Sequence, residues 1–208
     1  MIVSLRGLPM LREDRIRVLA RVARTPAPPL EGAGGDTDST SILALAAASY
    51  GAKPIDDATV PTGFDPVAVA LFEAIVEAAY LVATADGVVD AEERKMFERV
   101  VAESCGGAVA PKHIADLVGD LRGQLEEDGI DRRVVAVGQR VTKKGHAEEV
   151  LRIAALLAHA SDSVSDVERR MLVRIAEACK LTSEDVEIAL REVRVALADA
   201  EQSAKSSS

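Results

Sequence analysis

The chain is poor in aromatic side chains and in cysteine. Two Tyr, three Phe and no Trp occur in 208 residues, so the core must be built from Ala, Val, Leu and Ile. This composition favours close packing of helices over aromatic binding surfaces. Cys105 and Cys179 form neither a disulfide framework nor the spacing of a zinc site. We expect each to be a small buried hydrophobic residue near the end of a helix.

Positive charge is also scarce. The formal net charge is -9, whereas binding to nucleic acid without sequence preference depends on Lys and Arg that neutralise phosphates. Nucleic acid is therefore excluded as an expected partner. Cations and basic proteins are the partners that an acidic surface favours.

Long apolar segments are missing as well. No apolar run reaches the roughly 20 residues of a membrane-spanning helix, and Arg, Glu and Asp interrupt the N-terminal apolar stretch that a signal peptide would need. We therefore expect a cytoplasmic protein. The chain also lacks a phosphate-binding loop, a nucleophile elbow and a metalloprotease helix, so we expect no enzyme activity and no small-molecule substrate.

Apolar residues that recur at helical spacing predict an all-α protein without strands. The pattern divides the chain into an N-terminal amphipathic helix (1–24), a flexible linker (25–40), a short helix with a proline-rich lead-in (41–63), a main helical domain (64–200) and a disordered tail (201–208). The expected helix N-caps are Asp90, Asp131, Ser165 and Ser183.

The main domain contains an internal repeat. The segment LVATADGVVDAEERKMFERV (81–100) matches LLAHASDSVSDVERRMLVRI (156–175) at an offset of 75 positions. This register pairs Glu93 with Glu168 and also aligns the apolar positions, whereas an offset of 76 would pair more acids but break the apolar alignment. The repeat predicts two pseudo-symmetric helix-loop-helix halves that bury their apolar faces against each other.

Each half carries an acidic turn. In the first, Asp86 and Gly87 end one helix, Asp90 caps the next, and Glu92 and Glu93 lie in its first turn. Helix capping explains the acids from Asp90 onward. It does not explain Asp86, because an acid at a helix C-terminus opposes the helix dipole. Either a cation held between Asp86 and Glu93, or a salt bridge from Asp86 to Arg94 or Lys95, would compensate.

The candidate metal ligands are these acids and their counterparts in the second turn. Carboxylates of this kind suit calcium, magnesium or manganese. The second turn has Ser161 in place of Asp86, so its acids are shifted by one residue, and His159 nearby is better explained as a surface or packing residue than as a ligand. The candidate ligands are Asp86, Asp90, Glu92, Glu93, Asp162, Asp166 and Glu168.

The stretch ATADGVVDAEERKMFERV resembles the hallmark of the TerB-like family, which includes the tellurite-resistance protein TerB and the N-terminal region of the co-chaperone DjlA. The resemblance extends over about residues 64–200. It implies an all-α fold of two related halves, divalent-cation binding by Asp86 and Glu93, and a role in tellurite resistance or chemical-stress response, often with membrane-associated protein partners.

A second reading treats the domain as a protein-interaction scaffold whose acidic turns are helix caps only. The N-terminal helix has two interpretations also: it packs on the domain, or its Arg-rich face contacts a partner or an anionic membrane. Replacing Asp86 and Glu93 by their amides would separate metal binding from scaffolding.

Overall fold

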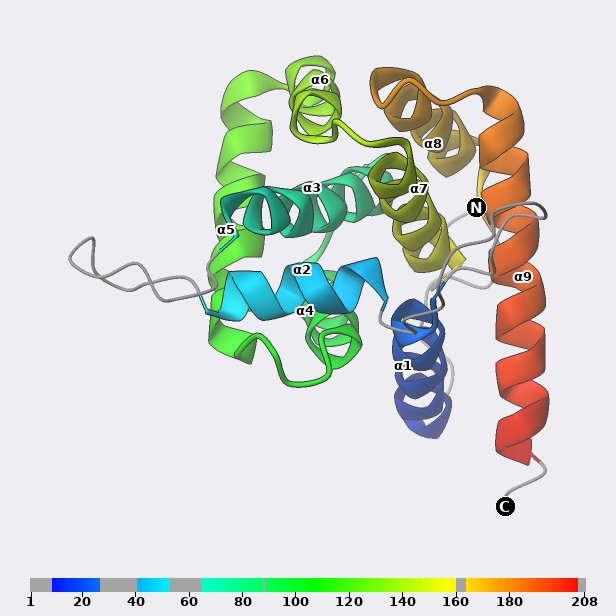
Figure 1. Cartoon of the computed structure of the whole chain (residues 1–208). Helices are drawn as coiled ribbons and strands as arrows, with labels where there is room; N and C mark the ends of the chain where they lie inside the picture. The colour runs from blue at the N-terminus through cyan, green and yellow to red at the C-terminus, as the bar shows by residue number, and fades with distance from the viewer. Residues whose placement is uncertain (1–8, 27–40, 53–64, 88, 160–163, 206–208) are drawn as a thin grey trace.

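A computed structural model describes residues 9–26, 41–52, 65–87, 89–159 and 164–205 of the chain. These residues form helices only, as the apolar periodicity predicts. Figure 1 shows the helices α1 (Pro9–Arg24), α2 (Ile42–Gly51), α3 (Pro66–Ala83), α4 (Ala91–Ser104), α5 (Pro111–Asp128), α6 (Ile130–Arg140), α7 (Lys144–Ala158), α8 (Asp166–Ala178) and α9 (Ser183–Lys205).

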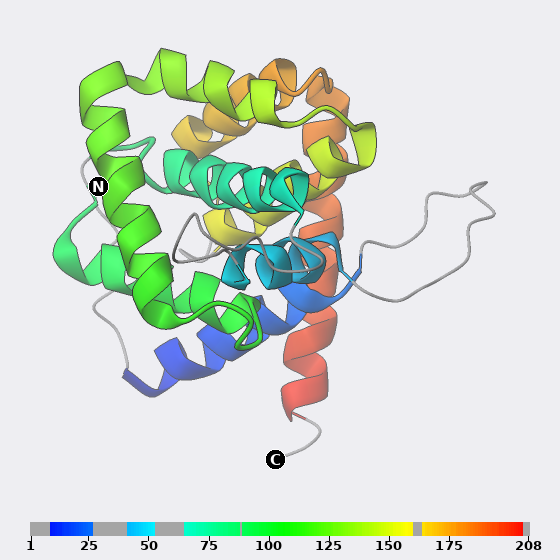
Figure 2. The same cartoon turned by 60° about the vertical axis from the view of Figure 1, so that its left-hand side comes forward.

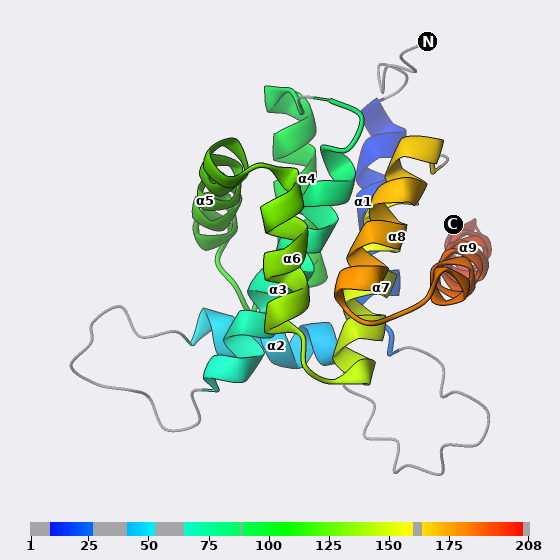
Figure 3. The same ribbon diagram turned by 90° about the horizontal axis from the view of Figure 1, so that it is seen from above.

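Helix α3 lies at the centre of the bundle. It packs most extensively against α7 and also contacts α2, α5, α6 and α8, while α5 and α9 lie on opposite sides of the molecule (Figures 1 and 3). By length and composition alone α3 could cross a membrane, but most of it is buried inside the bundle. Its buried Glu77 accepts hydrogen bonds from Arg133 and Arg140 of α6. Both features are those of a core helix.

The caps of the repeated helices confirm the offset of 75. Thr84 follows α3 as its C-cap and His159 follows α7. Asp90 and Ser165 are the N-caps of α4 and α8, and both take part in capping boxes. The same local chemistry therefore ends one helix and begins the next at equivalent points of the two halves.

Helices α1 and α2 join the same hydrophobic core as the repeat. Figure 2 shows α1 running along one edge of the bundle, where it contacts α4 and α9. Ile16, Leu19 and Val22 of α1 are buried in this core. The interpretation that α1 packs on the domain is therefore confirmed.

A buried polar network also holds α1 and α2 to α7. The Arg152 guanidinium of α7 donates hydrogen bonds to the carbonyls of Val22 (3.2 Å) and Ala23 (3.1 Å) at the end of α1. Glu149, which is paired with Arg152 at 2.7 Å, accepts a bond from the amide of Leu43 in the first turn of α2 (3.3 Å). Because the last carbonyls and first amides of a helix lack partners within that helix, one ion pair satisfies groups at both helix ends.

Two expected caps are wrong. Asp131 lies inside the first turn of α6, because Gly129 is the N-cap and has the positive φ of 77° that joins α5 to α6 within a single residue. Ser183 is the first residue of α9, and the cap is formed one residue earlier. There the Asp185 carboxylate accepts hydrogen bonds from the amide and hydroxyl of Thr182, both at 2.7 Å.

The expected disordered tail is also corrected in part. Helix α9 continues to Lys205, because Glu, Gln, Ala and Lys are good helix formers, and the Ser203 hydroxyl donates to the carbonyl of Asp199 (2.9 Å). The remaining residues of that tail (206–208), most of the expected linker (27–40) and the proline-rich lead-in (53–64) lie outside the described residues.

Candidate functional site

The first acidic turn is built by helix capping on one side and a glycine turn on the other. The Asp90 carboxylate accepts hydrogen bonds from the amides of Glu92 (2.8 Å) and Glu93 (2.9 Å), and Glu93 Oε2 accepts one from the amide of Asp90 (2.9 Å). Gly87 has a φ of 151°, which favours glycine. Asp86 is thus placed by the turn and remains exposed.

The second turn repeats the cap with a serine. Ser165 Oγ accepts a hydrogen bond from the amide of Glu168 (3.2 Å), and Glu168 Oε2 accepts one from the amide of Ser165 (2.7 Å). In both boxes the reciprocal bond uses one oxygen of the glutamate, Oε2. The cap also fixes where each glutamate side chain lies.

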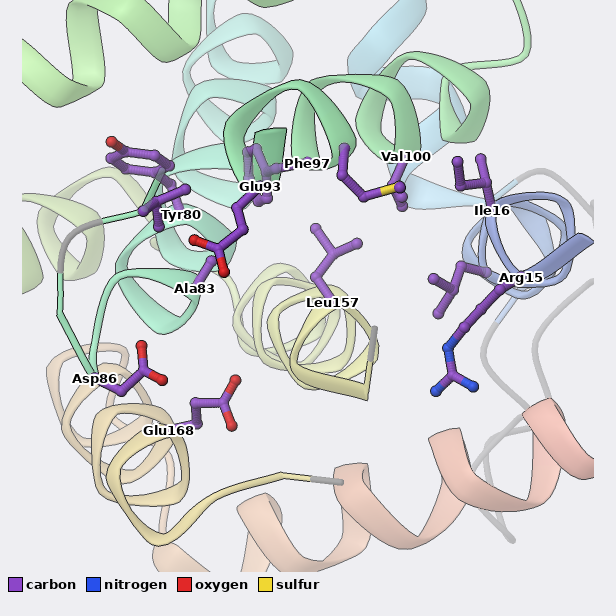
Figure 4. A pocket seen from close by; sticks show the side chains of 13 residues that line it. Arg15, Ile16, Tyr80, Ala83, Asp86, Glu93, Phe97, Val100, Leu157 and Glu168 are labelled. Atoms are coloured by element: carbon purple, nitrogen blue, oxygen red, sulfur yellow. The ribbon is translucent and has the colours of Figure 1, made fainter. Parts of the chain in front are cut away.

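The carboxylates of Asp86, Glu93 and Glu168 line one cavity of about 170 Å³. Figure 4 shows Asp86 and Glu168 at one side of this cavity, with Glu93 reaching toward them from α4. The repeat therefore brings acids from both halves to a common site. We call it the inter-repeat cavity. Its lining residues are Arg15, Ile16, Leu19, Tyr80, Ala83, Asp86, Val89, Glu93, Met96, Phe97, Val100, Leu157 and Glu168.

Most of the inter-repeat cavity is apolar. Phe97, Val100 and Leu157 are buried core residues that form part of its wall, and the ring of Tyr80 packs edge-on against Phe97 at 5.7 Å between centroids. Burial also raises the pKa of the Tyr80 hydroxyl. The cavity thus combines an acidic rim with a hydrophobic interior.

Helix α1 supplies a positive charge to the same lining. Arg15 lies across Leu157 from Asp86 and Glu168 (Figure 4), and its guanidinium donates a hydrogen bond to the carbonyl of His159. His159 is itself buried, with its Nδ1 2.9 Å from the carbonyl oxygen of Ala155. The histidine therefore has the packing role that the sequence favours.

A shared cavity is not yet a coordination sphere. Within the described part of the chain, no group of three or more His, Cys, Asp or Glu side chains is arranged to hold a metal ion. The shared lining does not by itself imply direct coordination, because lining residues can lie on opposite walls. Water-mediated binding remains compatible with the donor set, since magnesium keeps several of its waters when bound by one or two carboxylates.

The other candidate ligands lie elsewhere. Asp90 is engaged in its cap, and the exposed Glu92 and Asp166 occupy first turns without lining the cavity. Asp162 lies outside the described residues. Neither alternative salt bridge of Asp86 is present among the described residues: Arg94 pairs with Glu98 at 3.6 Å, and no ion pair joins Asp86 to Lys95.

Sequence reasoning did not identify the apolar lining or the contribution of α1. Both had a signal: the apolar face of α1 includes Ile16 and Leu19, and the offset of 75 already pairs Glu93 with Glu168. Whether such paired positions share a cavity depends on how the two halves pack, which the repeat pattern does not show.

The fold is that of an all-α repeat domain. Its central helices α3 and α7 belong to a duplicated helix-turn-helix unit, and the acidic turns of the two copies face one cavity. The family model described as tellurite resistance protein TerB matches residues 72–192, and the chain belongs to the TerB family. Helices α1 and α2 precede the matched region. No curated protein and no solved structure matches the chain.

Proposed function

We propose that this TerB-family chain binds a hydrated divalent cation, magnesium, manganese or calcium, at the acidic rim of the inter-repeat cavity. The observation that carries the proposal is that Asp86, Glu93 and Glu168, from both halves of the repeat, line the same cavity. Their carboxylates supply the hard oxygen donors that such ions prefer.

The openness of the site favours an ion that keeps its waters. Calcium needs six to eight oxygen ligands, whereas magnesium binds through one or two carboxylates and retains water in its octahedral shell. Asp86 and Glu93 are exposed and Glu168 is half-buried, so solvent can complete the shell. Magnesium or manganese is therefore the better fit, with weak affinity that responds to the ion concentration.

The family suggests the cellular setting of this proposal. A cation-responsive module in the cytoplasm would serve tellurite resistance or chemical-stress response, with protein partners that include membrane-associated ones. The net charge of -9 argues against nucleic acid as a partner. TerB is not a known enzymatic family, which supports a role without catalysis or a small-molecule substrate.

The alternative function is a helical interaction scaffold whose acidic turns only cap helices. It is favoured by the complete capping boxes at both turns, which account for Asp90, Glu93 and Glu168 without any ion. Asp86 distinguishes the two functions, since the caps give it no role.

The test compares paired amide variants. In Glu93→Gln with Glu168→Gln, the charge is lost but the cap can persist, because Gln also serves at this position of a capping box. The matched control is Glu92→Gln with Asp166→Asn, which alters the same first turns outside the cavity. Manganese is titrated into chelator-treated protein, and paramagnetic broadening of amide signals is followed by NMR.

We expect broadening around the two turns in the wild type and in the control. In the cavity variant the affinity should fall about tenfold or more, because each charged contact contributes roughly 1.5–3 kcal/mol. Equal broadening in both variants, or none at millimolar manganese, would refute cation binding at this cavity and leave the scaffold function.

A further inference from the structure

The interior of the inter-repeat cavity is poorly suited to a hydrated metal ion alone. Beyond the three carboxylates and Arg15, its walls come from apolar side chains of α1, α3, α4 and α7. Apart from the Tyr80 hydroxyl, these walls offer no hydrogen bonds to the water shell of an ion. An apolar space of this kind stays dry and can admit an apolar ligand.

The size of this space limits what it can take. At about 170 Å³, it is comparable to the apolar cavity of about 150 Å³ that admits benzene in another protein. By comparison with benzene, one compact apolar group of about six carbons would fill the inter-repeat cavity. A longer chain would have to project into solvent.

The charge of the lining determines the polar end of the occupant. Among the described residues, Asp86, Glu93 and Glu168 give the lining three negative charges against one positive charge, that of Arg15. Arg15 lies across Leu157 from Asp86 and Glu168 (Figure 4), and its guanidinium is engaged with the carbonyl of His159. A cationic group is therefore favoured at the side of the two acids, where Glu93 also points.

An aromatic surface adds to this preference. Tyr80 and Phe97 both line the cavity and pack against each other. Aromatic faces attract ammonium groups, and aromatic rings contribute a large apolar surface. Met96 completes the wall with a flexible thioether chain that adapts to irregular ligands.

We propose that the inter-repeat cavity binds a primary ammonium group carried on an apolar body of about six carbons, a size set by the cavity comparison above. The negative charges of Asp86, Glu93 and Glu168 attract the ammonium, and the body fills the space beside Phe97 and Leu157. This site does not depend on the metal proposal, because it uses the apolar interior that a metal would leave empty.

The ligand chemistry has two sources, a free aliphatic amine or the lysine side chain of a partner protein. Two probes distinguish them: hexylammonium, and Nα-acetyl-lysine methylamide. Both are titrated into the full chain with excess EDTA, and amide chemical shifts are followed by NMR. Tighter binding of hexylammonium assigns the site to a free amine, and tighter binding of the lysine compound assigns it to a protein lysine.

A series of related probes tests the apolar part and the charged part of the ligand separately. From propylammonium to hexylammonium the affinity should rise about fourfold for each added methylene, the effect of burying one CH₂ group, and then level off. Hexanol, which lacks the charge, should bind at least about tenfold more weakly, by the same reasoning as for charged hydrogen bonds. Affinity that ignores chain length or charge would overturn the proposal.

Two variants locate the site. Ala83→Leu places a larger side chain in the cavity lining at the end of α3 and should abolish amine binding. Ala83→Val should give a smaller loss and serves if the larger variant does not fold. Glu93→Gln with Glu168→Gln should weaken amine binding at least about tenfold.

Failure of the two proposals can be told apart. Amine binding in EDTA without any manganese effect would leave this inference standing alone. Manganese binding without amine binding, or amine binding unchanged in Ala83→Leu and in Ala83→Val, would overturn it.

Discussion

At the scale of single residues, burial determines the chemistry of the two thiols. Cys105 and Cys179 follow α4 and α8 as C-caps, and both are buried. Burial raises the pKa of Cys105 to about 12 and that of Cys179 to about 11. Since the thiolate is the reactive form, neither side chain has the character of a redox or catalytic cysteine. The expectation of small buried hydrophobic residues is confirmed.

A thiol-labelling experiment checks this conclusion. At pH 8 a maleimide should modify neither cysteine in the folded protein and both after unfolding, as counted by mass spectrometry. The raised pKa values of the two thiols also determine how the free energy of unfolding depends on pH. Their stabilising contribution is fully present below the ordinary value of 9.0 and is lost as the pH rises through the folded values. Rapid labelling of the native protein would contradict the burial.

At the scale of helices, close approach sets the position of α6 on α8. Gly138 in α6 lies so near the end of α8 that a Cβ atom there would be 2.2 Å from the carbonyl oxygen of Ala178. The backbone of α8 would have to move to admit any side chain. Glycine is therefore required here by packing, although it weakens the helix itself.

The matched pair Gly138→Ala and Gly119→Ala tests this contact. Gly119 lies in α5, with no atom within 4 Å of an added Cβ. Alanine there should stabilise the fold by up to about 1 kcal/mol through helix propensity. At Gly138 it should destabilise by about 1–3 kcal/mol, the usual cost of overpacking. Urea denaturation gives both values, and equal effects of the two changes would show that the close approach is not restrictive.

At the scale of the whole molecule, one buried ion pair joins the N-terminal helices to the family domain. Arg152 and Glu149 expose only 9% and 3% of their side chains, yet they bond to groups of α1 and to the start of α2. Helices α1 and α2 lie outside the region 72–192 that the TerB model matches. The structure thus extends the core of the domain by two helices.

The comparison of Arg152→Met with Arg169→Met measures this connection. Removing one partner of a buried pair leaves the other charge uncompensated and costs about 3–5 kcal/mol. Arg169 pairs with Glu187 on the surface, where both side chains are about half exposed, so its replacement should cost less than about 1 kcal/mol. Thermal unfolding measures the loss of stability in each variant. Similar losses in both would show that the buried network does not stabilise the packing of α1 and α2.

The sequence was sufficient for the helical class, the C-terminal end of α1, the repeat offset and the capping residues Asp90 and Ser165. These features follow from local rules, because apolar periodicity and capping depend on residues within a few positions of one another. The errors at Asp131 and Ser183 were local too, since Gly129 is the N-cap two residues before Asp131 and Thr182 caps α9 one residue before Ser183.

Only the tertiary structure determined the inter-repeat cavity. Glu93 and Glu168 are 75 positions apart, and Ile16 of α1 is farther still from both. Whether such residues share a lining depends on how helices cross, which no short-range pattern encodes. The sequence by itself therefore determined the elements and their caps, while the packing of the two halves and α1 decided which acids meet and what surrounds them.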